Sequence, residues 1–307
     1  MRPFAFPEAL VRGVIESRPN RFVMMVRHGD AVYRCHCPVT GDIAGLDFGR
    51  GGIPCLLSKN TAPKAKTDFT VEAISLDNVN IATANEGQDA SWIGINQNRA
   101  NRYVEHFLRQ GGLLGASQED QTHVDVSVPS RKRKKTKAKT VTNDDDRQAT
   151  LNSDSETQSE TAEVQRERVL GKSKIDFLIG DNHFCEVKSP LGSIPTRDHP
   201  NFDPKRKRPN VGITHRLIRH FDDLSLLLET DPTAAASIII FFMYDAPIFR
   251  PPTTDGKKAP AKEKEQYRTV LQASARARAA GVRFWQLNTR ITPTHVHFVS
   301  HFDLPDL

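Results

Sequence analysis

Asp176, Glu186 and Lys188 are the residues whose types and spacing could carry out chemistry in this sequence. They lie within residues 174–188, a stretch that has the pattern of a strand, a tight turn and a second strand. Because side chains alternate along a strand, Glu186 and Lys188 should point to one side and Val187 to the other. Across the hairpin, Asp176 could face Glu186. Two carboxylates and an ammonium group would then converge, and such a set can hold a hard divalent cation and a reacting water.

Hydrolysis of a phosphodiester bond is the reaction that this set would suit. The reaction needs charge neutralisation at the phosphate and an activated water. Asp176 and Glu186 would hold Mg²⁺ or Mn²⁺, and Lys188 could orient the water or stabilise developing charge. The spacing Asp-x(9)-Glu-x-Lys also occurs by chance, so the alternative is a surface hairpin whose charges form salt bridges.

The segments after the hairpin predict the elements that would position these side chains. Residues 191–212 form a polar loop with a basic cluster at 205–208, and Thr214 then caps a helix. Arg216 and His220 lie four residues apart on one face of that helix. Residues 238–243 are continuously apolar, as expected of a strand buried on both faces. A helix at 262–280 and strands at 282–287 and 295–302 complete a mixed α/β domain.

The first part of the chain predicts a different architecture. Residues 3–82 contain several short strand-like runs separated by Gly-rich corners, which favours a small barrel of the OB-fold type. The loop after Ser58 carries three lysines that could contact phosphates or could simply be solvated: Lys59, Lys64 and Lys66. Residues 96–110 have the periodicity of a helix with one apolar stripe. Arg99, Arg102 and Arg109 lie towards the other face, where they could be solvated or could contact nucleic acid.

Length and charge agree with a two-domain protein that has a polyanionic partner. The chain has 307 residues, a net charge of +6, a pI near 9.2 and only 37% hydrophobic residues. Residues 115–163 have few large apolar side chains, and a basic block at 131–139 precedes an acidic stretch. We expect a disordered insertion within the second domain. Its basic block could be a nuclear localisation signal, a nucleic-acid arm or a solvated tail.

Other features argue against a membrane or disulfide-stabilised protein. The longest apolar run has strand length, and the N-terminus does not have the pattern of a signal peptide, so we expect an intracellular protein, cytoplasmic or nuclear. The four cysteines have no zinc-site spacing and are expected to be reduced and buried: Cys35, Cys37, Cys55 and Cys185. His295 and His297 share a strand face, but a third ligand is missing from the pattern.

Four segments of the sequence together resemble the sugar fermentation stimulation protein A (SfsA) family. Their order and approximate placement match over nearly the whole chain apart from the insertion. The segments are His36-Cys37-Pro38-Val39-Thr40-Gly41, Asn96-Gln97-Asn98-Arg99-Ala100-Asn101-Arg102, Ser173-Lys174-Ile175-Asp176-Phe177 with Glu186-Val187-Lys188-Ser189, and Thr214-His215-Arg216 with His220. Val39 and Leu217 depart from the family pattern, which usually has Asn and Gly at these positions.

The resemblance implies an α+β protein of two domains. An OB-fold-like nucleic-acid-binding barrel would span residues 1–82. A restriction-endonuclease-like mixed α/β domain of the PD-(D/E)xK nuclease type would span 83–307. By this motif Asp176 and Glu186 are metal ligands and Lys188 is the catalytic lysine, while Thr214, Arg216 and His220 line the same cleft. The family also implies DNA binding and, in bacteria, a role in regulating sugar metabolism.

Two classes of function therefore remain. One is a nuclease that depends on Mg²⁺ or Mn²⁺. The other is a DNA-binding regulator that retains the nuclease fold without turnover. The expected partner is nucleic acid, with DNA as the expected class, and the residues predicted to contact it are Lys59, Lys64, Lys66, Arg99, Arg102, Arg216 and His220. A weaker third reading is a scaffold whose insertion recruits partners.

Overall fold

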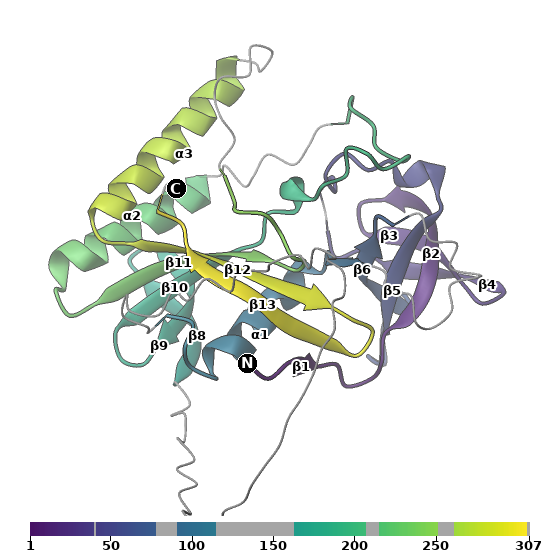
Figure 1. Ribbon diagram of the computed structural model, residues 1–307, viewed down its shortest axis with the longest axis horizontal. Helices are drawn as coiled ribbons and strands as arrows, with labels where there is room; N and C mark the ends of the chain where they lie inside the picture. Colours follow the sequence, from purple (N-terminus) through teal and green to yellow (C-terminus); the bar gives the residue numbers. More distant parts are fainter. Residues whose placement is uncertain (40, 78–90, 115–162, 207–214, 251–260, 306–307) are drawn as a thin grey trace, which may run out of the picture.

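A computed structural model describes residues 1–39, 41–77, 91–114, 163–206, 215–250 and 261–305 of the chain (Figure 1). It has a β-barrel on one side and an α/β domain on the other. Several sequence predictions concern residues outside the described ranges: Thr40, Thr214, the basic pair Lys207-Arg208, and the insertion expected at 115–163 apart from Glu163. None of the helices in the described ranges combines the length and the hydropathy needed to cross a membrane.

The barrel is built from β2 (Val11–Asn20), β3 (Val23–His28), β4 (Ala31–His36), β5 (Ile53–Lys59) and β6 (Phe69–Ser75). The strands follow the order β4-β3-β2-β5-β6 in antiparallel pairs, and a parallel pairing of β4 with β6 closes the barrel. Its interior is filled by fully buried apolar side chains, among them Ile15, Met24, Val26, Ile53, Leu57 and Val71. The OB-fold-like barrel predicted from the sequence is thus confirmed.

The second domain is a mixed sheet in the order β8-β9-β10-β11-β12-β13. Strands β10, β11 and β12 are parallel, and the others pair antiparallel. The carboxyl ends of these three parallel strands therefore meet at one edge of the sheet. The strand bounds are β8 (Val164–Leu170), β9 (Ser173–Ile179), β10 (His183–Lys188), β11 (Ala235–Phe242), β12 (Arg283–Ile291) and β13 (His295–Asp303).

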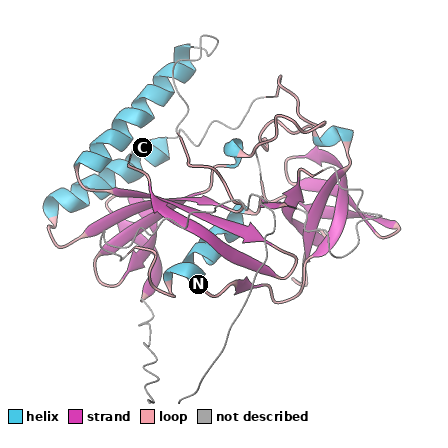
Figure 2. Ribbon diagram, viewed as in Figure 1, coloured by secondary structure: helices cyan, strands magenta, loops and turns pink. Residues whose placement is uncertain are grey.

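Helices cover both faces of this sheet (Figure 2). Helix α1 (Gln97–Leu108) lies on one face, and α2 (His215–Thr230) and α3 (Ala261–Ala279) lie on the other. Alternate residues of β11 enter the two cores: Ile238 and Ile240 pack with α2, and Ile239 packs with α1. This alternation explains the continuous apolar run, because a strand covered on both faces has no solvent-facing side.

Two short strands, which the sequence pattern did not predict, join the domains. β7 (Trp92–Gly94) pairs with β6 of the barrel and with β12 of the α/β sheet. β1 (Phe4–Ala5) pairs with β13, so the first residues of the predicted span 1–82 pack with the other domain. The barrel is therefore connected to the α/β sheet through backbone hydrogen bonds as well as through the chain itself.

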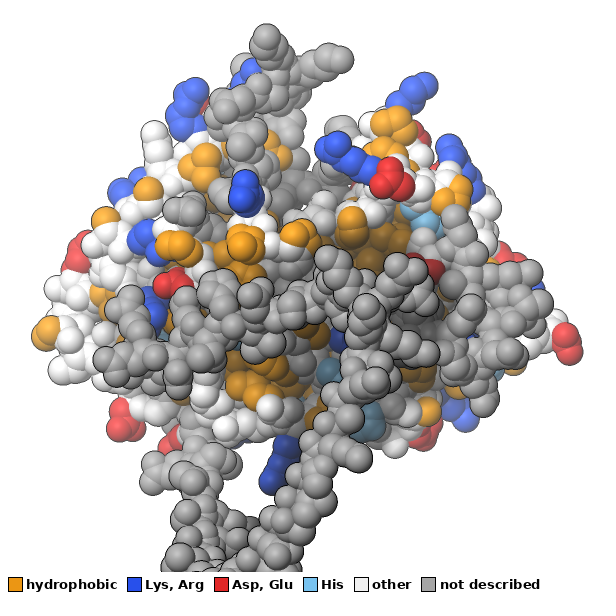
Figure 3. Space-filling model, viewed as in Figure 1, with side chains coloured by type: hydrophobic (Ala, Val, Ile, Leu, Met, Phe, Trp, Pro, Cys, Tyr) orange, Lys and Arg blue, Asp and Glu red, His pale blue; other side chains and the backbone are white. Residues whose placement is uncertain are grey.

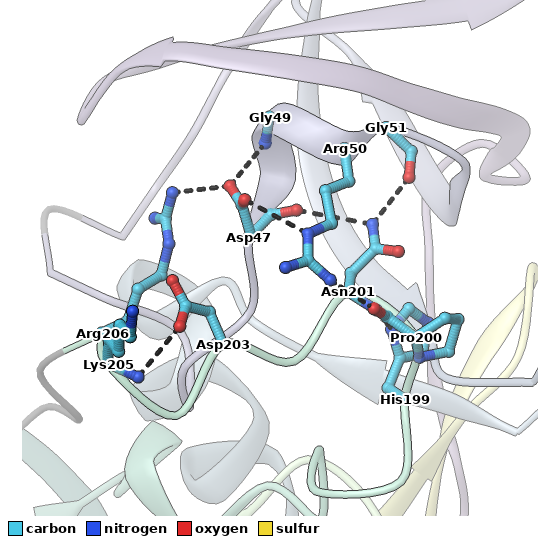
Figure 4. Close-up of polar contacts among 10 residues, drawn as sticks. All are labelled: Asp47, Gly49, Arg50, Gly51, His199, Pro200, Asn201, Asp203, Lys205 and Arg206. Carbon is cyan, nitrogen blue, oxygen red and sulfur yellow. Dashed lines mark hydrogen bonds and ion pairs between the residues drawn. The ribbon is translucent and has the colours of Figure 1, made fainter.

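A long segment of the α/β domain is also attached to the barrel (Figure 4). After η2 (Leu191–Ser193), residues 194–206, here termed the clasp, pack against the barrel loop around η1 (Phe48–Arg50). Asn201 Nδ2 donates to the Gly51 carbonyl at 2.7 Å, and Arg206 forms an ion pair with Asp47 at 2.6 Å. In the other direction, Arg50 donates to the Pro200 carbonyl at 2.7 Å. The clasp is thus held against the barrel through contacts at Pro200, Asn201 and Arg206.

Candidate active site

The predicted hairpin is β9 followed by β10, and its register brings Asp176 beside Glu186. Phe177 pairs with Cys185, and the Asp176 N–H donates to Glu186 Oε2 at 3.2 Å. The hairpin faces a pocket of about 290 Å³ to which α1 and α2 also contribute lining residues. The lining residues are Asn101, Asp176, Glu186, Val187, Lys188, Arg216 and Leu217. The predicted convergence of two carboxylates and a lysine is therefore present in the structure.

Both oxygens of Asp176 accept a hydrogen bond, which fixes the orientation of the carboxylate. Oδ1 accepts from Asn101 Nδ2 at 2.8 Å, and Oδ2 accepts from the Val187 N–H at 2.9 Å. Burial raises the pKa of Asp176, and the nearby negative charge of Glu186 raises it further. A bound cation would relieve this repulsion between the carboxylates.

Glu186 is 1% exposed and is surrounded by donors. Its Oε1 contacts the Lys188 ammonium group and lies 2.6 Å from His220 Nδ1. Burial by itself raises the pKa of Glu186, but the hydrogen bond from His220 and the charge of Lys188 outweigh burial and lower that pKa. The neighbouring carboxylates are thus shifted in opposite directions, a pattern typical of sites whose acidic groups have different roles.

The contacts of His220 indicate which of its nitrogens carries the proton. Arg216 Nε donates to His220 Nε2 at 3.4 Å, so Nε2 acts as an acceptor. Nδ1 then carries the proton and donates to Glu186. Arg216 and His220 are separated by one helical turn of α2, as the sequence predicted. Arg216 thereby orients His220, and His220 orients Glu186.

The residues at this site fit a hard divalent cation. Asp176 and Glu186 offer carboxylate oxygens to the pocket, and oxygen is the ligand type that Mg²⁺ prefers. Among the described residues, no group of three or more His, Cys, Asp and Glu side chains is placed to hold a metal. The protein would therefore supply few ligands, and water and a substrate phosphate would supply the rest, as is common for Mg²⁺.

The other predicted nucleic-acid contacts lie at varying distances from this pocket. Of these, Arg216 lines the pocket and His220 contacts Glu186 behind it. Lys59, at the end of β5, is exposed, as are Lys64, Lys66 and Arg102. Arg99 is engaged elsewhere: its guanidinium lies 3.4 Å from Glu72 Oε1 in the barrel.

Two residues with buried or site-facing polar contacts, Asn101 and Glu72, were missed by the sequence reasoning. Asn101 projects from the first turns of α1 to Asp176, and its membership of the Asn-rich segment at 96–102 was the only available signal. Glu72 is 1% exposed and accepts from Ser58 Oγ at 2.5 Å and from Asn96 Nδ2 at 2.8 Å. Nothing in the strand pattern of residues 69–76 distinguishes this glutamate from a solvent-facing one.

The structure also shows the surroundings of the four cysteines and of the pair His295 and His297. All four cysteines are buried and free of disulfides, as predicted. Cys185 lies between Phe184 and Glu186 on β10, and burial raises its pKa well above the ordinary value. The ring centroids of His295 and His297 are 5.6 Å apart, and among the described residues they do not belong to a group of three or more potential metal ligands.

Comparison with known proteins identifies relatives that cover both domains. The family model described as the SfsA N-terminal OB domain matches residues 17–83. The sugar fermentation stimulation protein homolog of Synechococcus sp. (strain JA-2-3B'a(2-13)) is 26% identical over 304 residues, which cover 96% of this chain and 92% of the relative. The homolog of Microcystis aeruginosa (strain NIES-843 / IAM M-2473) is 24% identical over 302 residues, 96% of this chain and 95% of its own.

A solved structure has the same fold. SfsA of Pyrococcus furiosus, solved in complex with Ca²⁺, aligns over 98% of this chain and 98% of its own with a TM-score of 0.57 and 15% sequence identity. The OB domain, the full-length relatives and the shared architecture agree with one another. The barrel thus matches the SfsA N-terminal OB domain, and the whole chain is similar to sugar fermentation stimulation protein homologs.

Proposed function

We propose that this protein binds nucleic acid and hydrolyses phosphodiester bonds with Mg²⁺ or Mn²⁺ held by Asp176 and Glu186. The observation that carries the proposal is the convergence of these carboxylates and Lys188 on one pocket, with each carboxylate oriented by donors from neighbouring elements. The Ca²⁺ bound by the Pyrococcus furiosus protein supports a divalent-cation site in this fold, because Ca²⁺ also takes oxygen ligands.

Each side chain would have a distinct role in the reaction. The metal would supply charge neutralisation and a water of lowered pKa. Lys188, whose ammonium group lies at the pocket, would stabilise negative charge developing on the phosphate. His220 would hold Glu186 in place, and Arg216 would both fix His220 and offer its guanidinium to a phosphate. Asn101 would keep Asp176 directed at the pocket.

The nucleic acid would be held by cations from both domains. The exposed lysines Lys59, Lys64 and Lys66 follow the barrel strand whose Ser58 contacts the Glu72–Arg99 pair. Among the described residues on the face in Figure 3, Lys and Arg side chains are scattered rather than gathered in one patch. Contacts of these lysines with phosphates would release counterions, so binding should weaken as salt rises. DNA is the expected substrate class.

A second candidate is a DNA-binding regulator that retains the site without turnover. The specific observation in its favour is the contact of Lys188 and His220 with the same oxygen of Glu186. These groups already neutralise Glu186 without a metal. In this candidate the arrangement stabilises the fold and takes no part in a reaction.

One experiment distinguishes the two candidate functions. The full chain would be incubated with Mg²⁺ or Mn²⁺ and a panel of single- and double-stranded DNA and RNA. The nuclease reading predicts cleavage of at least one substrate, which Glu186→Gln abolishes while binding persists. The matched control is Glu167→Gln, since Glu167 is an exposed carboxylate on β8 that pairs with Lys174.

The same preparations distinguish the alternatives by binding. If the wild-type protein binds nucleic acid in a salt-sensitive way but cleaves none of the substrates, the second candidate, a DNA-binding regulator without turnover, is supported. Absence of both binding and cleavage across the panel would refute the nucleic-acid assignment itself.

A further inference from the structure

Another pocket, of about 500 Å³, lies where the barrel meets the α/β domain, and we term it the junction pocket. It shares no lining residue with the pocket at Asp176. Its wall combines residues of β2, the end of β6, β7, the clasp, and the segments that follow β11 and β12. The lining residues are Arg12, Leu76, Asp77, Ser91, Trp92, Ile93, Pro195, Tyr244, Asp245, Arg290, Thr292 and Pro293.

The topology places the junction pocket at the same edge of the sheet as the candidate active site. Lys188 ends β10, while Tyr244 and Asp245 follow the end of β11 and Arg290 lies near the end of β12. These three strands are parallel. In open α/β sheets, ligands bind in crevices outside the carboxyl ends of the strands. The junction pocket therefore lies where this architecture provides ligand sites.

The cations of the junction pocket come from both domains. Arg12 belongs to β2 of the barrel and Arg290 to β12 of the α/β sheet. Within the described part of the chain, neither guanidinium lies within 4.0 Å of a carboxylate oxygen. Guanidinium groups without carboxylate partners are available to bind phosphate, which Arg recognises through parallel hydrogen bonds.

The carboxylates of the junction pocket restrict which anion can enter. Asp77 Oδ2 accepts from the Ser91 N–H at 2.7 Å, and Asp245 Oδ1 accepts from Asn288 Nδ2 at 3.3 Å. Each carboxylate has a second oxygen that can accept from a ligand hydroxyl or amino group. A ligand that carried only negative charge, such as a dicarboxylate, would be repelled by both. The pocket thus favours a phosphate attached to a group rich in donors.

Aromatic side chains provide the apolar part of the wall. Trp92 is 5% exposed and Tyr244 is 9% exposed, so both rings are fixed by packing and present only a small surface to the pocket. The Tyr244 hydroxyl donates to the Ser193 carbonyl at 3.0 Å, and its ring packs against Phe242 with centroids 5.5 Å apart. A rigid aromatic wall suits a flat ring, and the volume of the pocket lies in the range of small-molecule sites.

We infer that the junction pocket binds a phosphorylated nucleoside, with the phosphate on Arg12 and Arg290, hydroxyl or amino groups on Asp77 and Asp245, and the base against the aromatic wall. The same chemistry could come from a free nucleotide or from one nucleotide of a bound strand. The inference does not depend on hydrolysis at Asp176, because the pockets have separate linings.

The test uses the full chain without divalent metal, so that no cleavage occurs. Calorimetric titration with 5′-AMP, with adenosine and with a length series of single-stranded oligonucleotides would compare wild type with Arg290→Ala. Arg290 is exposed, so its replacement should leave the fold intact. Arg168→Ala, an equivalent charge change on the exposed edge strand β8, is the matched control.

We expect 5′-AMP to bind wild type more tightly than adenosine, and Arg290→Ala to weaken 5′-AMP binding about tenfold, as expected for one charge-assisted phosphate contact. If 5′-AMP does not bind but Arg290→Ala weakens binding of the longer oligonucleotides alone, the occupant is a nucleotide of a bound strand. If the Arg290→Ala and Arg168→Ala proteins have the same affinity as each other for each ligand, the inference is overturned. A loss of cleavage activity in the experiment on Glu186 would leave this result unaffected.

Discussion

The barrel and the α/β domain each contain a buried glutamate next to a cation, and the two glutamates differ in what surrounds them. Glu72 and Glu186 are both 1% exposed. Glu72 pairs with Arg99 at 3.4 Å and accepts hydrogen bonds from Ser58 and Asn96. Glu186 contacts Lys188 and His220 but also forms part of a pocket wall beside a second carboxylate.

The first turns of α1 contact both clusters. Arg99 reaches Glu72 in the barrel, and Asn101 reaches Asp176 at the pocket. Helix α1 therefore links two polar clusters. The cluster at Glu72 connects the domains, and the cluster at Asp176 lines a pocket that could bind a ligand. The comparison shows that burial and ion pairing do not by themselves mark a functional carboxylate. A second carboxylate and an adjacent cavity are the features that distinguish Glu186.

The largest expected effect concerns Lys188. If the ammonium group stabilises charge on the phosphate, Lys188→Ala should lower turnover by about 10²-fold or more, because such stabilisation is worth several kcal/mol. Lys174→Ala removes an exposed lysine from the neighbouring strand, where it pairs with Glu167, and should leave turnover unchanged. Single-turnover cleavage by both variants, with binding measured in parallel, makes the comparison. Equal rates would remove Lys188 from the reaction.

The barrel cluster should instead govern stability. Arg99→Ala leaves Glu72 buried without its cation and should lower the free energy of unfolding by about 3 kcal/mol. Its effect on metal binding by the folded protein should be small. Arg102→Ala, at an exposed position on the same helix, is the control for loss of charge. Urea denaturation measures the difference, and a stability equal to that of Arg102→Ala would show that Glu72 does not depend on the ion pair.

Two half-buried histidines should lose their contribution to stability at a higher pH than Glu186 does. Burial lowers the pKa of His183 and of His301 to about 4, and the charge of Arg283 contributes to both shifts. In the unfolded chain, histidine titrates near 6.5, so below that pH the unfolded state binds more protons and stability falls. The loss should develop between pH 6.5 and pH 4, and should not exceed about 3 kcal/mol for each histidine.

The contribution of Glu186 to stability should be lost at a lower pH than that of the histidines. Because its pKa is lowered, the stability it provides is present above the ordinary value of 4.5 and is lost as pH falls through its pKa in the folded state. Denaturation at pH 7 and pH 5 tests the histidines, with His301→Gln compared with His215→Gln at the exposed start of α2. If the stability of His301→Gln falls between pH 7 and pH 5 as steeply as that of the control, the loss of stability cannot be assigned to His301.

The smallest expected effect is that of Asn101. Asn101→Ala removes one donor from Asp176 and should weaken metal binding about tenfold, as is typical for groups that orient a metal ligand. Asn98→Ala changes a residue of the same helix that is exposed and is the control. Titration with Mn²⁺ measures both. An unchanged affinity would mean that the Val187 N–H alone orients Asp176.

The hairpin and the general architecture could be predicted because they depend on local patterns. Alternation places Glu186 and Lys188 on one face, and the turn at Gly180, whose φ is 58°, fixes the return of the chain. The helices containing Arg99 and Arg216 follow from their apolar stripes. Each of these signals lies within a few residues of the element that it specifies.

The remaining features depend on contacts between distant segments. The clasp joins Asn201 to Gly51 across 150 positions of sequence through loop backbone, for which no periodic pattern exists. The pairing of β1 with β13 also joins the ends of the chain. Asn101 was recognisable as a helix residue, but its partner Asp176 lies 75 positions away. The sequence therefore predicted the convergence of Asp176, Glu186 and Lys188 better than the residues that hold them in place.

Binding of Mn²⁺ to the full chain tests the central claim most directly. We expect wild type and Glu72→Gln both to bind Mn²⁺ at one site, while Glu186→Gln loses this binding and remains folded. Calorimetric titration of the three proteins, each checked by thermal unfolding, gives the result. Binding that is retained by Glu186→Gln, or that is equally absent from folded wild type, would contradict the assignment of Glu186 as a metal ligand.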